Sequence, residues 1–268
     1  MSASVCEVQK TVKPTVEKPL NVRGRKFGGA QPLFCIPLVA GDTGELVTQA
    51  EIARSLNPDL VEWRADYTKN CTPDVLTNSA SLLRKTLPEH PILFTLRIGA
   101  EGGAQEMSQP ARQSAISAVL RSRTIDLLDL ELANEPEFLN TLIPLAREHG
   151  VPVILAFHDF QATPSSDCLI GKIAAMSAAG ADIAKLAVMP RMAEDVFRIL
   201  EVTSEARKQF PALPLAIMAM GALGSITRVA GFLYGSDMAF AVGKEASAPG
   251  QIPIVEARTL TEMLLRYS

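Results

Sequence analysis

The segment GADIAKLAVMP, residues 180–190, places one lysine in the middle of an apolar run. Such a run suits a buried strand, where an ammonium group is unfavourable unless it is paired or takes part in a reaction. Burial disfavours the charged form of lysine, so we expect Lys185 to lose its proton readily. A neutral amine attacks a ketone to form an imine, and the iminium ion acidifies the neighbouring carbon. Lys185 is therefore the candidate nucleophile.

A base must then remove the proton from that carbon. His158 ends the apolar segment VPVILAFH, which precedes the strand of Lys185, and it is the candidate general base and acid. Glu101 is placed to orient the imidazole and to support its charged form. His149 lies at a helix end, where a cation favours the helix dipole, and His90 lies in LPEHP, which looks exposed. Neither His149 nor His90 is expected to take part in the reaction.

Further charges alternate with apolar residues in other strand-like segments. Successive side chains of a strand point to opposite faces, so the charges share one face and the apolar residues the other. One interpretation is a buried ion-pair network. However, charges that come late in several parallel strands converge at the end where barrel enzymes build their active sites. The residues concerned, apart from Lys185, are Glu62, Arg64, Arg97, Asp129 and Glu131.

The apolar segments recur about every 29 residues, the size of a strand–helix unit. They begin near residues 33, 60, 92, 125, 151, 182, 213 and 237, with helix-like stretches at 72–87, 135–150 and 193–210. This pattern predicts an α/β fold, a (β/α)8 TIM barrel, in a single domain over residues 1–268. An open doubly wound sheet is the alternative, but no GxGxxG follows the first strand. Residues 1–30 form either a hairpin that closes the barrel bottom or a loose arm.

The composition excludes several classes of protein. A net charge of −3 gives no basic surface for nucleic acid or an anionic membrane. No apolar run is long enough to span a bilayer, and the N-terminus lacks the apolar core of a secretory signal, so we expect a cytoplasmic protein. A disulfide framework and a zinc site are not expected, because the four cysteines are far apart and the three histidines form no HxH or HExxH pattern. No cofactor or other metal is expected either. Cys35 and Cys168 are expected in the core.

Taken together, the segments resemble those of type I 3-dehydroquinate dehydratases. The matching motifs occur in the expected order over roughly residues 33–255: EWRAD (62–66), TLR with EGG (95–103), LDLEL (128–132), FHDF (157–160), DIAKLAVMP (182–190), MG with TRVAG (220–231) and SAPGQ (247–251). The resemblance implies a (β/α)8 barrel, usually a homodimer. It also implies that the chain dehydrates 3-dehydroquinate to 3-dehydroshikimate in the shikimate pathway.

The resemblance also implies a role for each catalytic candidate. Lys185 matches the Schiff-base lysine, which condenses with the C3 ketone of the substrate. His158 matches the residue that takes the C2 proton and later assists loss of the C1 hydroxyl as water. Glu101 matches the carboxylate paired with this histidine.

For substrate binding, the resemblance implies that Arg228 grips the carboxylate. It implies that ring hydroxyls are bound by Glu62, Arg64 and Arg97, and that the loop closing over the substrate contains Ser247 and Gln251. Asp129 and Glu131 would support the lysine and the arginines. Where the family often has a first-strand serine near the substrate, this sequence has Pro37.

Two other functions fit parts of the pattern. A different class I aldolase-like lyase would use the glycine-rich stretch MGALGS after the seventh strand to bind a phosphate. A non-catalytic barrel would bind a quinate-like metabolite and report it to a partner. Detection of an enone product and of a covalent adduct on Lys185 separates these alternatives from a dehydratase.

Overall fold

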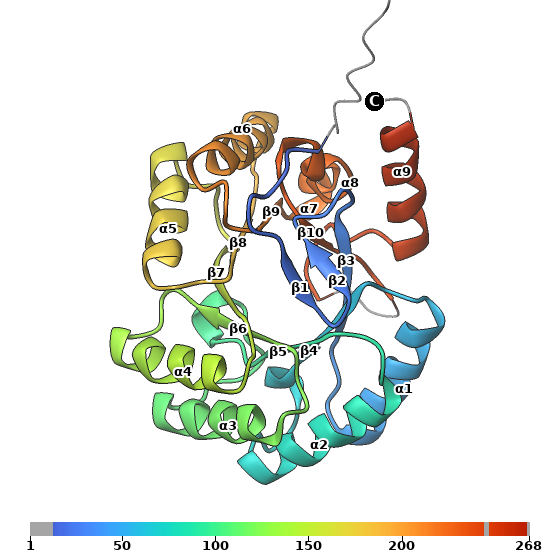
Figure 1. Ribbon diagram of the computed structural model, residues 1–268, viewed down its shortest axis with the longest axis vertical. Helices are drawn as coiled ribbons and strands as arrows, with labels where there is room; N and C mark the ends of the chain where they lie inside the picture. Colours follow the sequence, from blue (N-terminus) through green and yellow to red (C-terminus); the bar gives the residue numbers. More distant parts are fainter. Residues whose placement is uncertain (1–12, 244–246, 267–268) are drawn as a thin grey trace, which may run out of the picture.

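The computed structural model describes residues 13–243 and 247–266. Eight strands form a curled sheet with helices around its outside, and Figure 1 looks along the resulting barrel. The predicted (β/α)8 barrel is therefore confirmed. Around the barrel the strands are β3 (Leu33–Leu38), β4 (Leu60–Arg64), β5 (Ile92–Thr95), β6 (Leu127–Glu131), β7 (Val153–Asp159), β8 (Ile183–Val188), β9 (Leu215–Ala219) and β10 (Met238–Phe240). Their ladders are parallel from β10 through β3 to β9.

Hydrogen bonds close the barrel between β9 and β10. The amide of Asp237 donates to the carbonyl of Leu215 at 2.6 Å, and the amide of Ile217 donates to Oγ of Ser236 at 3.1 Å. The Asp237 carboxylate also accepts the amide of Leu215 at 2.9 Å. One buried acidic residue therefore occupies the seam of the barrel.

The helices form the outer layer of the barrel. They are α1 (Thr43–Ser55), α2 (Pro73–Thr86), α3 (Gln109–Ser122), α4 (Pro136–Glu148), α5 (Ser166–Ala178), α6 (Ala193–Gln209), the short α7 (Gly221–Gly224) and α8 (Ile226–Ala230), and α9 (Ile254–Arg266). Helix α2 begins as the sequence predicts, because the Thr72 side chain accepts the amide of Val75 and proline fills the first position. The other two helix-like stretches, 135–150 and 193–210, contain α4 and α6.

The strand faces sort as their alternation predicts. Val61 and Trp63 of β4 are fully buried between the sheet and the helices, where Trp63 meets Phe94 edge to face at 5.2 Å between ring centroids. Such a pair contributes about 1 kcal/mol beyond its buried area. The opposite face supplies an inner apolar layer that includes Leu60, Leu93, Leu127, Ile154 and Ile183. The charged residues lie beyond this layer, toward the carboxyl ends of the strands.

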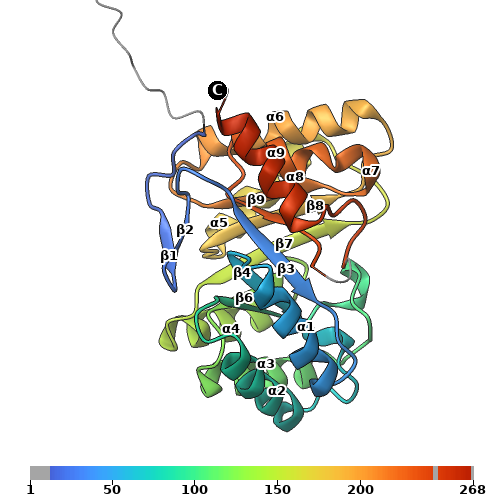
Figure 2. The same ribbon diagram turned by 90° about the vertical axis from the view of Figure 1, so that its right-hand side faces the viewer.

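A two-stranded antiparallel hairpin precedes the barrel. Its strands are β1 (Leu20–Val22) and β2 (Arg25–Phe27), and Val22 and Phe27 pack on the inner apolar layer. Figure 2 shows the hairpin at the end of the barrel where β3 begins. The predicted hairpin at the barrel bottom is therefore confirmed, whereas residues 1–12 lie outside the described residues.

A buried ion triad joins the segment before the hairpin to the barrel seam. Lys13, 2% exposed, places Nζ 2.5 Å from Oδ1 of Asp237 and also donates to the carbonyl of Gly29. Arg207 of α6 donates to Oδ2 of the same carboxylate at 2.6 Å. Because both cations are buried, the carboxylate compensates charges that would otherwise be costly.

Candidate active site

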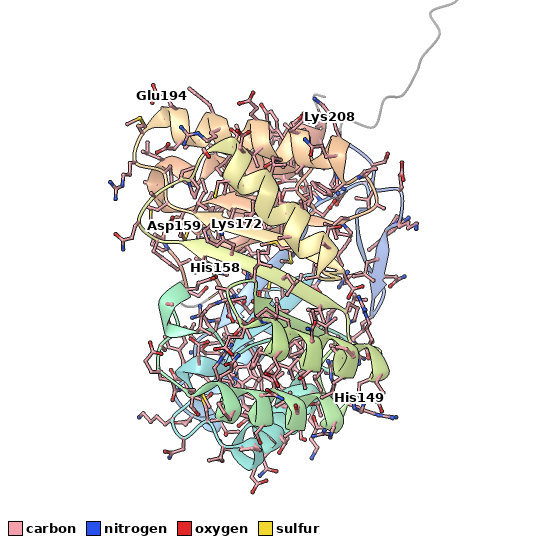
Figure 3. All side chains as sticks on the ribbon, turned by 90° about the vertical axis from the view of Figure 1, so that its left-hand side faces the viewer. His149, His158, Asp159, Lys172, Glu194 and Lys208 are labelled. Atoms are coloured by element: carbon pink, nitrogen blue, oxygen red, sulfur yellow. The ribbon has the colours of Figure 1, made fainter. Side chains whose placement is uncertain are left out.

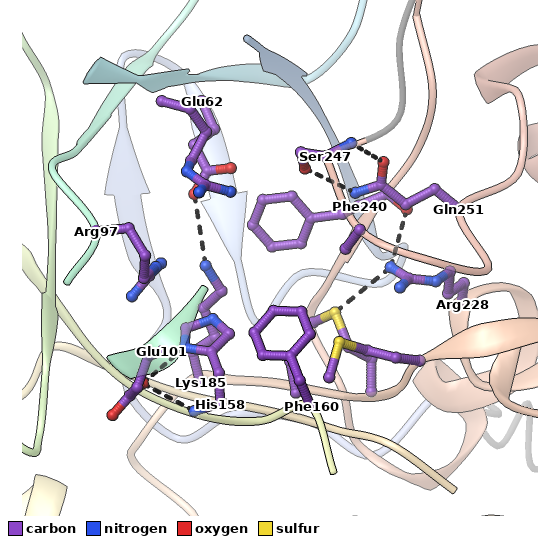
Figure 4. A pocket seen from close by; sticks show the side chains of 15 residues that line it. Glu62, Arg97, Glu101, His158, Phe160, Lys185, Arg228, Phe240, Ser247 and Gln251 are labelled. Carbon is purple, nitrogen blue, oxygen red and sulfur yellow. Dashed lines mark hydrogen bonds and ion pairs between the residues drawn. The ribbon is translucent and has the colours of Figure 1, made fainter. Parts of the chain in front are cut away.

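A pocket of about 430 Å³ opens at the carboxyl ends of the barrel strands. All nine catalytic or binding residues expected from the sequence line it (Figure 4): Glu62, Arg64, Arg97, Glu101, His158, Lys185, Arg228, Ser247 and Gln251. Sequence reasoning did not select the six other lining residues, which are Phe160, Ala187, Met218, Met220, Phe240 and Ala248. None of the described pocket-lining residues comes from β3, the strand that contains Pro37.

Lys185 lies in β8 with its side chain 4% exposed. Its Nζ donates to Oδ2 of Asp129 at 2.8 Å and lies 3.5 Å from Oε1 of Glu62 and 4.5 Å from the ring centroid of Phe240. Two carboxylates thus lie beside the amine, and the expectation that Lys185 loses its proton readily stays a prediction. The contact with Asp129 fits the supporting role that the family resemblance implies for this residue, whereas strand alternation alone could not show it, because the two residues are 56 positions apart.

His158 lies one strand away, and its neighbour is a carboxylate. In the register of β7 and β8, Ala156 is opposite Lys185 and His158 is opposite Ala187, so both functional side chains reach the same cavity. Oε2 of Glu101 lies 2.8 Å from Nδ1 of His158 and accepts the His158 amide at 2.9 Å. With Nδ1–H directed at the carboxylate, Nε2 is the free basic nitrogen.

Burial moves the pKa values of this pair in opposite directions. Desolvation lowers the pKa of His158 well below its ordinary value of 6.5, and the charges of Arg97, Lys185 and Arg64 lower it further. Desolvation also raises the pKa of Glu101 to about 7. Near neutral pH the imidazole is therefore an available base, and the ionisation of its partner changes in the same range.

His158 and His149 lie at opposite ends of the barrel (Figure 3). His149 ends α4, as its place before Gly150 indicates. The expectation of an exposed His90 is wrong, because this residue is only 8% exposed. Cys35 is buried as expected, but Cys168 is exposed in the first turn of α5, where the helix face turns to solvent.

Two of the three pocket arginines have acidic partners. Arg64 binds the carboxylate of Asp66 through Nε and Nη2, both at 2.8 Å. Arg97 pairs with Asp129 and with Glu131, each at 2.8 Å. The buried charges of these arginines are thereby balanced before any ligand arrives, which leaves their remaining N–H groups to bind neutral or weakly polar atoms.

Arg228 differs from the other two arginines. It is 3% exposed, its Nε has no hydrogen-bond partner among the described residues, and within these residues no carboxylate pairs with it. Its other hydrogen bonds go to the carbonyls of Phe240 and Pro249 and to Sδ of Met218. Desolvation lowers the pKa of Arg228 from 12.5 to about 10. A buried cation without a counter-ion beside a pocket is suited to an incoming anion.

The loop from residue 247 to 251 covers one side of the pocket. Its two predicted residues bind one another: the Ser247 amide donates to Oε1 of Gln251 at 3.0 Å, and Gln251 Nε2 donates to Oγ of Ser247 at 3.1 Å. Gly250 has φ +77°, and a Cβ there would lie 2.1 Å from the carbonyl oxygen of Gly221. A glycine is thus required for the loop to pack against the start of α7.

The glycine-rich stretch after β9 packs closely on that strand. A Cβ at Gly224 would lie 2.4 Å from the carbonyl carbon of Ala219. Helix packing accounts for this glycine, so it gives no independent support for a phosphate-binding loop. Within the described ranges, no group of three or more His, Cys, Asp or Glu residues is arranged to hold a metal ion. Among the described helices, none has the length and apolar character needed to cross a bilayer.

Comparison with known proteins gives a consistent result. Residues 34–267 match the sequence model of the type I 3-dehydroquinase family. A 3-dehydroquinate dehydratase of Aromatoleum aromaticum is 42% identical over 252 residues, 93% of this chain and 96% of that protein. A second one, from Geobacillus thermodenitrificans, is 40% identical over 93% of this chain and 97% of its own length.

Solved structures agree with the sequence relatives. The 3-dehydroquinate dehydratase of Geobacillus kaustophilus superimposes with a TM-score of 0.92 at 41% identity, covering 94% of this chain and 98% of that one. A type I enzyme from Clostridium difficile, solved with covalently modified comenic acid, gives a TM-score of 0.91 at 29% identity over 94% and 99% of the two chains.

Proposed function

Since the chain belongs to the type I 3-dehydroquinase family, we propose that it converts 3-dehydroquinate to 3-dehydroshikimate through an imine on Lys185. This reaction is a step of the shikimate pathway. One observation carries the proposal: a single pocket contains a lysine, a basic imidazole and a buried arginine with no carboxylate partner among the described residues. Together these groups form an imine, move a proton and hold an anion.

The proposed reaction begins when the C3 ketone of the substrate meets the amine. Lys185 gives up a proton, its nitrogen bonds to C3, and the carbonyl oxygen leaves as water. Asp129, 2.8 Å from Nζ, remains beside the positive iminium nitrogen and stabilises it. The iminium draws electrons from the C2–H bond, which weakens that bond.

His158 then carries a proton between two positions. Its Nε2 takes the proton from C2, and the imidazolium that forms is stabilised by Glu101. The same proton passes to the C1 hydroxyl, which leaves as water while the C1–C2 double bond forms. Water finally hydrolyses the imine, so the net change is the loss of one water molecule and Lys185 is regenerated.

Substrate orientation follows from the charges of the pocket. Arg228 binds the carboxylate, since its charge is the one that lacks an acidic partner in the described structure. The paired residues Glu62, Arg64 and Arg97 bind the ring hydroxyls, for which balanced charges with free polar atoms are suited. Ser247 and Gln251 close over the bound ring.

We also propose that the protein is a cytoplasmic homodimer. The family resemblance supports the dimer, and so do the large apolar side chains exposed on α7, α8 and α9: Leu223, Ile226, Val255 and Met263. Sedimentation velocity measures the mass of the species directly. A protein that remains monomeric at micromolar concentration would contradict the dimer without affecting the proposed reaction.

Intact mass after reduction with borohydride in the presence of substrate tests the reaction. We expect a stable adduct on the wild type and none on Lys185→Ala, together with the enone absorbance of the product. His158→Ala should still form the adduct, but its turnover should fall on the order of 10²-fold or more. Binding without an adduct or turnover would instead favour a metabolite sensor, and an adduct without an enone would favour an aldolase-like lyase.

A further inference from the structure

The loops that follow β4 and β5 are joined through Asp66, a residue that the reaction described above does not use. Its side chain is 1% exposed and accepts both Nε and Nη2 of Arg64. The same carboxylate accepts the amide of Ala104, at 2.9 Å, from the neighbouring loop. The backbone carbonyl of Asp66 accepts Nε2 of Gln105 at 2.7 Å. Four contacts thus bind one acidic residue to both loops.

The neighbouring loop is the one that carries Glu101. Glu101 ends a short 3₁₀ turn, and Gly102, at φ +84°, ends that turn in a left-handed conformation. The carbonyl of Gly102 accepts Nη2 of Arg64 at 3.1 Å, so the Asp66–Arg64 pair contacts the chain one residue after Glu101. A Cβ at Gly102 would lie 2.6 Å from the ring of Phe160, so Gly102 also packs closely against that ring. The turn is therefore held both by the Asp66–Arg64 pair and by its packing on Phe160.

The Asp66–Arg64 pair also determines which nitrogen atoms of Arg64 are available to bind a ligand in the pocket. Nε and Nη2 donate to Asp66, whereas Nη1 makes none of these contacts. Without the Asp66 charge, Arg64 would place an uncompensated cation near His158. That cation would favour the neutral imidazole and oppose the imidazolium that forms when the C2 proton is removed.

We propose that Asp66 is a positioning residue for the dehydration step, which it supports by holding the Glu101 turn against His158 and by neutralising Arg64. This inference rests on the proposed function. It predicts an effect after imine formation, because within the described residues Asp66 forms neither a hydrogen bond nor an ion pair with Lys185. A carboxylate with only a structural role would change the stability of the protein but not the ratio of the rates of imine formation and dehydration.

Asp126 is a matched control at the other end of the barrel. Like Asp66, it accepts one backbone amide, that of Ile92 at 2.8 Å, and pairs with arginine, namely Arg84 and Arg23. It does not line the pocket. Asp126→Asn should therefore lower the unfolding temperature without changing kcat by more than about twofold.

The experiment compares single turnovers of wild type, Asp66→Asn and Asp126→Asn, measuring the borohydride-trapped imine and the enone in the same reaction. For Asp66→Asn we expect the imine to form at the wild-type rate and the enone to form roughly 10- to 100-fold more slowly, because Glu101 and His158 would be displaced from one another. The inference would be overturned if Asp66→Asn formed the enone at the wild-type rate, or if its KM rose while kcat stayed unchanged. In either case, an adduct on the wild type would still support the proposed function. No adduct on the wild type would overturn both.

A double-mutant cycle tests whether Asp66 acts through the carboxylate of the neighbouring turn. In a Glu101→Gln background, Asp66→Asn should lower kcat by a smaller factor than in the wild type, because the part of its effect that depends on the Glu101 turn is already lost and only the part due to the Arg64 charge remains. Additive losses would overturn the inference. If Asp66→Asn does not fold, Gln105→Ala removes a contact between the same loops without leaving a charge unpaired. It should slow enone formation at least threefold, and an unchanged rate would be contrary to the inference.

Discussion

Arg228 and Arg207 are buried to a similar degree but differ in their partners. Arg207 pairs with Asp237, whereas Arg228 has no carboxylate beside it in the described part of the chain. Burial lowers the pKa of Arg228 from 12.5 to about 10, and one pKa unit corresponds to about 1.4 kcal/mol. Keeping this guanidinium charged therefore costs about 3 kcal/mol of folding free energy.

Hydrogen bonds offset part of that cost. Arg228 donates to the carbonyls of Phe240 and Pro249, and each bond contributes about 1 kcal/mol. Replacement by methionine removes the charge and the bonds, so Arg228→Met should raise the free energy of unfolding by about 1 kcal/mol without ligand. The same change should raise KM roughly 10²- to 10³-fold, since the substrate carboxylate loses its buried partner.

Urea unfolding followed by the fluorescence of Trp63, the one tryptophan of the sequence, measures the stability. With a slope of about 3 kcal/mol per molar for a chain of this size, the midpoint should rise by about 0.3 M. Arg207→Met is the matched control, and it should lose about 3 kcal/mol with unchanged KM because Asp237 loses a partner. If Arg228→Met is instead less stable than the wild type, or keeps its KM, the reasoning about an unpaired cation is refuted.

Two further predictions concern Glu101 and Lys13. Protonation of Glu101, whose pKa burial raises to about 7, removes the charge that supports the imidazolium, so kcat/KM should fall as the pH drops through 7. Glu101→Gln should lower the rate on the order of 10²-fold at pH 8 and abolish this dependence, and a pH profile that keeps its acid limb would contradict the assignment. Lys13→Ala leaves the buried Asp237 carboxylate with one cation fewer and should cost about 3 kcal/mol in urea unfolding with kcat unchanged. Lys208→Ala, which removes an exposed ion pair, should cost less than about 0.5 kcal/mol, and equal losses in the two variants would exclude a specific role for the triad.

The recurrence of apolar segments about every 29 residues was sufficient to predict the barrel, and period-two alternation within them predicted the direction of the charged side chains. Glu62 and Arg64 alternate with Val61 and Trp63, so a single strand reveals which face meets the helices. Lys185 could be selected for a related reason, because a lone charge in an apolar strand needs an explanation. These are local signals, and local signals can be read from one sequence.

Partners distant along the chain could not be predicted in the same way. The ion pair of Lys185 with Asp129 depends on the register of three strands, so the family resemblance, and not the local pattern, indicated that Asp129 supports the lysine. His90 looks exposed in LPEHP, yet the fold buries it beside the barrel bottom. Cys168 looks like a core residue, but its helix directs it to solvent. Burial at such positions is decided by tertiary packing rather than by neighbouring residues.

The uneven pairing of the pocket arginines has a consequence for the choice of inhibitors. A ring compound with one carboxylate can match the guanidinium of Arg228 and leave every other ion pair undisturbed. A dianion such as a phosphate monoester would bring a second negative charge toward Glu62 and Glu101, which repel it. The electrostatics of this cavity therefore discriminate by the number of charges on a ligand as well as by its shape.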